Sequence, residues 1–357
     1  MKTFLLKAWL TRRWAARLMW PLAQTYGLLV RMRRSLYQRG ILASSRFHVP
    51  VVVVGNVIAG GAGKTPLVMA LVRHLQAQSI RVGVVSRGYG RSGHKALEVT
   101  PTIAVDTSGD EPALILRTTG APVFVANRRV DAVHALLTAY PNTDVVVCDD
   151  GLQHYALERN IEIVVFDDRG VGSGWLLPAG PLREPWPERR RQGVDLVLHT
   201  GRHPAFEGYT SRRQLATHAV AVDGRRIDLT TLVNKPVTAL AGIASPEEFF
   251  AMLRSAGLTL ENTISLPDHH AFKAGELAAF TGKTVLCTEK DAVKLFALPD
   301  HGVVELLAVA LEFSPEPAFF KAFDALLAPL LSHLTSQNGH QTTCTAGLPS
   351  DQRPSRL

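Results

Sequence analysis

The chain has 357 residues, which is longer than one ordinary domain and suits two. Apolar residues make up 46% of the chain and charged residues 20%, so the composition supports a packed core and excludes a protein that is disordered throughout. Three cysteines are too few for a disulfide framework, and they indicate a reducing compartment.

The formal net charge of +8 is unevenly distributed along the chain. Residues 1–97 contain 16 Lys and Arg and no Asp or Glu, whereas the rest of the chain contains 23 basic and 31 acidic side chains. A basic front end on an acidic body indicates that one end of the chain meets an anionic surface. A nucleic-acid-binding arm is the alternative, but no nucleic-acid-binding module follows it, so we expect no nucleic-acid partner.

The N-terminal segment, residues 1–40, is basic and rich in tryptophan. It carries nine Lys and Arg together with Trp9, Trp14 and Trp20. Its least polar stretch, residues 18–30, is interrupted by a proline and is shorter than the roughly 20 residues that a membrane span needs. We expect an amphipathic helix in the plane of a membrane surface, with a basic helix packed on its own domain as the alternative.

Residues 41–215 alternate short apolar strands with helical stretches. The predicted strands are residues 50–54, 80–86, 122–126, 143–148, 161–166 and 194–199, and the predicted helices are residues 65–76, 112–118 and 128–140. Continuous apolar strands between helices predict a parallel sheet that is covered on both faces. A long loop rich in Pro, Gly and Arg follows at residues 170–191, and loops of that length are commonly functional or mobile.

A second, smaller α/β domain is predicted at residues 236–332, after linking strands at residues 216–235. Its predicted strands are residues 236–243, 284–288 and 303–313, and its predicted helices are residues 246–255 and 315–331. The polar tail, residues 333–357, is predicted to be disordered.

The strongest motif in the chain is GNVIAGGAGKTP at residues 55–66. It joins a predicted buried strand to a predicted helix, which is the setting of a phosphate-binding loop. Glycines let backbone N–H groups close around phosphate oxygens, Lys64 reaches the β- and γ-phosphates, and the Thr65 hydroxyl holds Mg²⁺. The predicted ATP-binding residues are Gly60, Gly61, Ala62, Gly63, Lys64, Thr65 and Pro66.

Two glycine-rich stretches match the standard nucleotide-binding patterns only in part. Ile58 stands where the general phosphate-loop pattern has its first glycine, so the interpretation relies on the strand and helix around the loop. Residues 88–93 fit the dinucleotide pattern G-x-G-x-x-G, but no helical pattern follows them, so we interpret them as a loop over the active site. The predicted fold class is α/β: a P-loop NTPase-like parallel-sheet domain with a second, smaller α/β domain and an N-terminal amphipathic helix.

Two adjacent carboxylates, Asp149 and Asp150, follow the apolar strand that ends at Cys148. A carboxylate at the C-terminal end of a strand beside the phosphate loop is where Mg²⁺ is held in this fold. The sequence therefore predicts a magnesium site made of Thr65, Asp149 and Asp150, with an exposed turn as the alternative.

Seven strings resemble the lipid A 4'-kinase family (tetraacyldisaccharide 4'-kinase). In chain order between residues 55 and 294 they are GNVIAGGAGKTP, SRGYGR, GDEPALI, DDGLQH, LLPAGPLREP, DHHAF and TEKDAVK. The resemblance implies that ATP phosphorylates the 4'-hydroxyl of a tetraacylated glucosamine disaccharide 1-phosphate to give lipid IVA. It further implies a peripheral or monotopic enzyme at the cytoplasmic face of an inner membrane, with a glycolipid substrate and no protein partner.

The resemblance also implies roles for individual residues. Asp110 resembles the family's catalytic base, supported by His269, and Lys64 completes the predicted catalytic set. The alternative for Asp110 is a helix cap. The candidate substrate- or phosphate-binding residues are Arg87, Tyr89, Gln153, His154, Arg183 and Glu184.

Several alternatives stay open at this point. Arg183 and Glu184 could clamp a phosphate or pin their own loop. Residues 288–291 could face the nucleotide, or Asp291 could cap the following helix. A membrane-targeted P-loop regulatory ATPase is the alternative function, although Ala59 stands where the partition-type ATPases carry a lysine. A nucleic-acid-binding P-loop protein is a third class.

Overall fold

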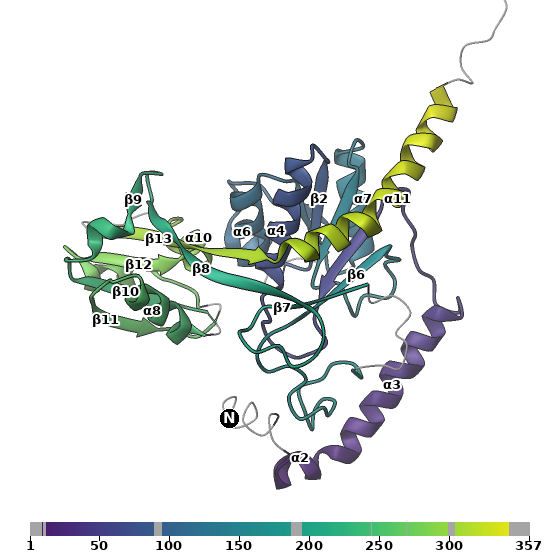
Figure 1. Ribbon diagram of the computed structural model, residues 1–357, viewed down its shortest axis with the longest axis horizontal. Coiled ribbons are helices and arrows are strands. Elements are labelled where there is room, and N and C mark those ends of the chain that lie inside the picture. The colour runs from purple at the N-terminus through teal and green to yellow at the C-terminus, as the bar shows by residue number, and fades with distance from the viewer. Residues whose placement is uncertain are drawn as a thin grey trace, which may run out of the picture.

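The computed structural model describes residue 9 and residues 12–88, 95–186, 195–243, 245–268, 270–298 and 304–342, with side chains as far as residue 332. Two groups of strands, each with its own helices, are joined by two long strands (Figure 1). All the described strands belong to one thirteen-stranded sheet in the order β11-β10-β12-β13-β8-β7-β6-β1-β5-β2-β4-β3, with β9 paired to β8.

The first group of strands is mainly parallel and buried. It consists of β1 (Val51–Gly55), β2 (Val82–Ser86), β3 (Leu97–Glu98), β4 (Val123–Val125), β5 (Val145–Asp149), β6 (Ile161–Phe166) and β7 (Leu196–His199). Only the short β3 is antiparallel to its neighbour. Strands rich in valine can be buried on both faces because helices cover each side of the sheet, and two apolar cores lie on its two faces. The predicted α/β class with a parallel sheet is confirmed.

Four helices accompany these strands. They are α4 (Lys64–Ala77), α5 (Val105–Ser108), α6 (Asp110–Thr119) and α7 (Arg129–Ala139). The carboxyl ends of β1 and β5 lie side by side, because Val54 pairs with Asp149. The phosphate loop and the two predicted magnesium carboxylates are therefore neighbours at one edge of the sheet.

The second group of strands shares the sheet through β8 and β13. Its elements are β8 (Tyr209–Ala221), β9 (Arg226–Asp228), η1 (Leu229–Leu232), β10 (Val237–Ala241), α8 (Pro246–Ser255), β11 (Leu260–Ser265), α9 (Ala274–Leu277), η2 (Ala278–Phe280), β12 (Thr284–Thr288), α10 (Glu289–Leu295) and β13 (Glu305–Pro315). Strand β8 pairs with β7 at one end and with β13 along most of its length. The link between the groups thus begins at Tyr209, ahead of residue 216, while the domain boundaries stay a prediction.

The last helix, α11 (Pro317–Thr342), packs on the first group of strands (Figure 1). Phe319, Phe323 and Leu327 are buried in its core. The helix continues past residue 332, so the beginning of the predicted disordered tail is helical. A helix already nucleated by packing extends at little further cost where no proline interrupts it. Residues 343–357 lie outside the described part of the chain.

The N-terminal helices are α2 (Trp14–Leu18) and α3 (Trp20–Gln38), which lie against the proline-rich loop. Their buried residues are small: Ala16, Ala23 and Gly27. A Cβ at Gly27 would come within 2.6 Å of Leu176 Cδ1, so glycine permits this close approach. The opposite face exposes large apolar side chains. No helix in the described part of the chain has the length and apolar character that a membrane crossing requires.

Candidate active site

The phosphate loop connects β1 to α4 as predicted. Gly60 and Gly63 have φ angles of 100° and 78°, a backbone conformation that L side chains rarely adopt. Arg169 donates to the carbonyl oxygens of Ala59 (3.2 Å) and Gly61 (2.7 Å), and the Thr200 hydroxyl donates to that of Ala62 (3.0 Å). These bonds fix the loop through its carbonyl groups. Ala59 N–H donates to the Pro181 carbonyl oxygen at 2.8 Å, so the N–H groups left for phosphate oxygens are those from Gly60 onward.

Lys64 is the first residue of α4, and its side chain is nearly buried. Its Nζ lies 3.4 Å from Asn56 Oδ1 and 3.5 Å from Asp150 Oδ1. Both distances are long for a charge-assisted hydrogen bond, which is typically about 2.7–2.9 Å. The ammonium group is therefore held over the loop without being tightly bound, as a phosphate-binding lysine requires.

Asp149 ends β5, and its carboxylate is buried. Neither of its oxygens has a hydrogen-bond partner among the described residues. Burial, with smaller contributions from Glu111 and Asp150, raises the pKa of Asp149 to about 7. A buried carboxylate whose oxygens lack donors fits a divalent cation, which would compensate its charge and use its free oxygens.

Asp150 has a different environment. Burial raises its pKa, but Lys64, Arg183 and Arg129 outweigh burial and hold the pKa below its ordinary value. Its backbone adopts a φ of 49°, which turns its side chain away from that of Asp149 toward these cations. The two predicted magnesium carboxylates are thus unequal, with Asp149 uncompensated and Asp150 paired. The described residues contain no cluster of three or more His, Cys, Asp or Glu side chains, so Thr65 and phosphate oxygens would complete the coordination of Mg²⁺.

Asp110 begins α6 and is buried. Gly109 occupies the N-cap position, and Asp110 Oδ1 accepts the backbone N–H of Glu111 at 3.1 Å, so this oxygen serves the start of the helix. Lys294 Nζ lies 3.0 Å from Asp110 Oδ2, and Lys290 Nζ lies 3.9 Å from the same oxygen. Both lysines lie on α10, so the second group of strands supplies the cations that compensate this carboxylate. The charge of Glu111, the next residue, contributes to the raised pKa of Asp149. The start of α6 therefore interacts electrostatically with a predicted metal ligand.

The segment around the predicted D-H motif meets the same two lysines. Lys290 Nζ lies 3.0 Å from Asp268 Oδ1, and Lys294 Nζ donates to the His270 carbonyl oxygen at 3.2 Å. His269 itself lies outside the described residues, as does Tyr89, and their predicted roles stay predictions. The described neighbours of His269 nevertheless contact the same two lysines as Asp110 does.

The TEKD segment, residues 288–291, contains the cap of α10 and one of the two lysines that lie near Asp110. The Thr288 side chain caps α10 by accepting from Asp291 N at 3.2 Å, so Thr288 rather than Asp291 is the cap. Asp291 is buried and accepts from Thr288 Oγ1 (2.6 Å) and from Gly242 N (3.0 Å). Lys290 and Lys294 are four residues apart on one face of the helix, and this spacing in TEKDAVK is the signal that could have identified them.

Gln153, Arg183 and Glu184 form a connected network beside Asp150. Gln153 Nε2 donates to Glu184 Oε1 at 2.7 Å and to the Asn56 carbonyl oxygen at 3.1 Å. Arg183 Nη1 lies 3.5 Å from Asp150 Oδ1 and 3.4 Å from Gln153 Oε1. Glu184 is buried and pins the loop, whereas the Arg183 guanidinium reaches the site. The loop-pinning alternative therefore holds for Glu184, whereas a phosphate contact of Arg183 stays a prediction.

His154 and Arg87 lie at the margins of the site. His154 Nε2 accepts the backbone N–H of Arg129 at 3.0 Å, at the start of α7. Burial, followed by the charges of Arg129 and Arg159, lowers the pKa of His154 to about 4, so the ring is neutral. Arg87 is exposed after the end of β2. Substrate contacts of both residues stay predictions.

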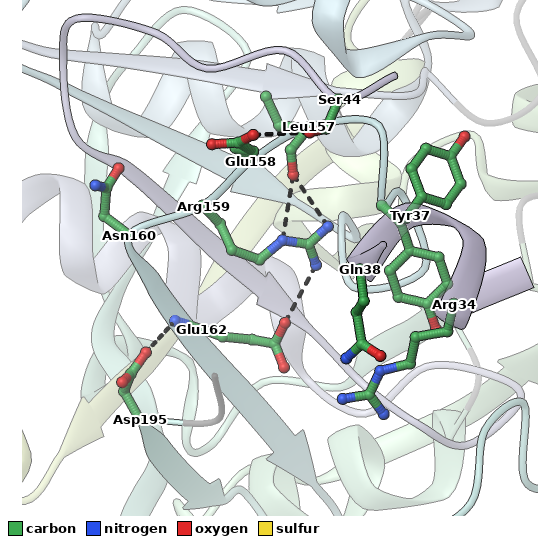
Figure 2. A pocket seen from close by; sticks show the side chains of 11 residues that line it. Arg34, Tyr37, Gln38, Ser44, Leu157, Glu158, Arg159, Asn160, Glu162 and Asp195 are labelled. Atoms are coloured by element: carbon green, nitrogen blue, oxygen red, sulfur yellow. Dashed lines mark hydrogen bonds and ion pairs between the residues drawn. The ribbon is translucent and has the colours of Figure 1, made fainter. Parts of the chain in front are cut away.

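A hollow behind the Gln153 loop contains none of the phosphate-loop residues (Figure 2). Its central side chain is Arg159, which donates to the carbonyl oxygens of Leu152 (2.9 Å) and His154 (2.8 Å) and pairs with Glu162 at 3.2 Å. Tyr37 of α3 lines the same hollow. Arg159 therefore fixes the loop around Gln153, a role that the sequence did not reveal.

Comparison with known proteins identifies the relatives of this chain. The family model for tetraacyldisaccharide-1-P 4'-kinase matches residues 15–328. The chain belongs to this family. The tetraacyldisaccharide 4'-kinase of Polaromonas naphthalenivorans is 74% identical over 343 residues, covering 96% of this chain and 100% of the relative. The enzyme of the same name from Acidovorax ebreus is 51% identical over 335 residues, covering 93% and 95%.

The fold agrees with a solved member of the family. The crystal structure of LpxK from Aquifex aeolicus in complex with ATP matches with a TM-score of 0.76 at 27% identity, covering 89% of this chain and 99% of that one. Family membership confirms the predicted class of lipid kinase, its place in lipid A biosynthesis and its use of ATP, with Mg²⁺ expected for such kinases. The roles of single residues and any contact with a membrane are not decided by these matches.

Proposed function

We propose that this chain transfers the γ-phosphoryl group of ATP to the 4'-hydroxyl of a tetraacyldisaccharide 1-phosphate, with Asp110 accepting the hydroxyl proton. The observation that carries this proposal is that the phosphate loop and Asp149 are neighbours at the ends of β1 and β5, while Glu111, next to Asp110, interacts electrostatically with Asp149. Lys64 and the N–H groups of the phosphate loop bind the phosphates, and the Asp110 carboxylate, compensated by the ammonium groups of α10, accepts the proton.

In this proposal the two carboxylates after β5 have separate tasks. Asp149, together with the Thr65 hydroxyl, would hold Mg²⁺, because the oxygens of Asp149 have no other partner among the described residues. Bound Mg²⁺ neutralises negative charge that develops on the transferred phosphoryl group. Asp150 orients Lys64 and Arg183 instead.

We also propose that α2 and α3 lie on the cytoplasmic face of an inner membrane, where the acylated substrate is embedded. Trp14 and Leu18 expose 74% and 75% of their surface, and five further large apolar side chains on these helices are exposed: Trp20, Leu22, Leu28, Leu29 and Met32. Arg13, Arg17 and Arg31 alternate with them. Apolar side chains interleaved with arginines are typical of a helix that lies at an anionic membrane surface.

The activity is tested with the purified full-length chain, ATP, Mg²⁺ and tetraacyldisaccharide 1-phosphate. A single phosphoryl group on the 4' oxygen supports the proposal, and a disaccharide whose 4'-hydroxyl is blocked is the matched control. ATP hydrolysis without lipid phosphorylation would instead support the regulatory ATPase.

The membrane proposal is tested by co-sedimentation with anionic phospholipid vesicles. Because α3 packs on the proline-rich loop, we prefer the double substitution Leu22→Gln and Leu29→Gln to deletion of residues 1–40. This variant should lose most of its vesicle binding, while Val222→Gln, an exposed apolar residue on the second group of strands, should bind normally. Unchanged binding of the double variant would place the anchor elsewhere.

A further inference from the structure

A partly buried arginine on β8 lies against the phosphate loop. A Cβ at Gly63, the residue before Lys64, would collide with the guanidinium of Arg213, which places this group beside the start of α4. Thr200, at the end of β7, lies at the same point and holds the Ala62 carbonyl oxygen. Arg213 thus reaches the loop from the strand that joins the two groups of the sheet.

The charge of Arg213 is poorly compensated by the protein. Its Nε is buried without a hydrogen-bond partner, and no ion pair of Arg213 occurs in the described part of the chain. Its guanidinium carbon lies 6.0 Å from the centre of the Phe313 ring, a contact that provides no anion. Burial lowers the pKa of Arg213, and the charges of Glu248 and Asp167 oppose that effect only in part.

The nearby carboxylates are already engaged. Asp167 forms an ion pair with Arg169, whose Nη2 lies 2.6 Å from its Oδ2. Asp168 accepts the backbone N–H of His203 at 2.7 Å. A partly desolvated cation without an ion pair among the described residues is unfavourable in the free protein, so Arg213 gains from an anionic ligand at the loop.

We propose that Arg213 binds the phosphate chain of the nucleotide and supplies a second positive charge besides Lys64. A guanidinium donates several N–H groups in a fixed plane, which suits phosphate oxygens better than a single point charge. Because Arg213 lies on β8, this contact ties nucleotide binding to the strand that links the two groups of the sheet.

The test measures nucleotide binding by the full-length protein without lipid acceptor, so that its outcome does not depend on the proposed transfer reaction. Arg213→Met keeps the length of the side chain and removes its charge. We expect its affinity for MgATP to fall by about ten- to a hundredfold, the size of a lost charge-assisted hydrogen bond. Arg212→Met, on the exposed face of the same strand, is the control and should bind MgATP normally.

Thermal unfolding separates binding from a structural role. If Arg213 serves the nucleotide, the free Arg213→Met protein should be at least as stable as the wild type, because a poorly compensated, partly buried charge has been removed. The rise in Tm on adding MgATP should be smaller. Wild-type affinity, or a lower Tm of the free protein together with a normal MgATP-induced rise, would overturn the proposal.

If Arg213→Met does not fold, Arg213→Lys provides the test. This variant keeps a positive charge beside Phe313 but lacks the planar guanidinium with its several N–H donors. Its affinity for MgATP should therefore fall at least about threefold. A wild-type affinity in this variant would overturn the proposed contact.

Discussion

Lys294 Nζ lies 3.0 Å from Oδ2 of Asp110, and this ion pair joins α10 to the start of α6. The two residues are far apart in the sequence and belong to different groups of strands. The pair compensates the buried charge of the proposed base, and it couples the orientation of the base to the placement of the second group. Lys294 is therefore a positioning residue for Asp110 in the proposed mechanism.

Replacing Lys294 with Met should lower both stability and turnover. Of the two lysines, Asp110 would keep Lys290, at 3.9 Å, and a buried carboxylate that loses its nearest cation costs about 1–3 kcal/mol in the free energy of unfolding. Urea denaturation measures this loss, and Lys283→Met, at an exposed site, should stay within about 0.5 kcal/mol of the wild type. A Lys294→Met protein of wild-type stability would show that the ion pair contributes nothing.

Lys64→Ala should abolish phosphoryl transfer while the protein still folds. Lys64 makes only two long contacts, and Asp150 keeps Arg183 when the lysine is removed. The free energy of unfolding should therefore change by less than about 1 kcal/mol. Steady-state kinetics and thermal unfolding check the two statements, with the exposed Lys321→Ala as control. Near-normal turnover would refute the assignment of the phosphate loop.

The stability of the protein should fall as the pH drops from 6.5 to 4, partly because of His154. Its pKa is about 4 in the folded protein and about 6.5 in the unfolded chain, so below pH 6.5 the unfolded state binds the additional proton. Because His154 is partly exposed, we discount the shift for solvent screening and expect a loss of about 1 kcal/mol at pH 5. Unfolding of His154→Gln should be less dependent on pH in this window, and an identical dependence would contradict the prediction.

Asp149→Asn separates metal binding from folding. The substitution removes a buried carboxylate whose oxygens have no partner among the described residues, so the free protein should be as stable as the wild type or more stable. Turnover at saturating ATP should fall strongly, because the variant has lost its proposed Mg²⁺ ligand. The dependence of the rate on Mg²⁺ concentration measures this effect. A wild-type Mg²⁺ requirement would transfer the role to Asp150.

The sequence predicts the parallel sheet well because its strands are apolar throughout. The predicted ranges 161–166, 246–255 and 284–288 coincide with β6, α8 and β12. Strand β11 escapes prediction because it lies at the edge of the sheet and reads LENTIS, with most of its side chains exposed. The long β8 carries mainly polar residues at its start and shows no apolar alternation there.

The site is predictable where its residues are neighbours in the sequence and is less so where they are not. Gly60–Pro66 and the Asp149–Asp150 pair each follow a buried strand, and that local context indicates their chemistry. The contacts of Lys290, Lys294 and Arg213 depend on how the second group of strands is placed against the first. No local pattern contains that information, so the partners of Asp110 emerge only from the fold.

The central claim, that Asp110 accepts the proton of the 4'-hydroxyl, is tested by kcat and the KM for ATP in Asp110→Ala. A base contacts only the acceptor, so kcat should fall by about 10² to 10⁴, while the KM for ATP stays within about twofold of the wild-type value. If His269 orients Asp110, the double variant with His269→Ala should be scarcely slower than Asp110→Ala alone. An unchanged kcat in Asp110→Ala would contradict the account and leave Asp149 or Asp150 as the candidate base.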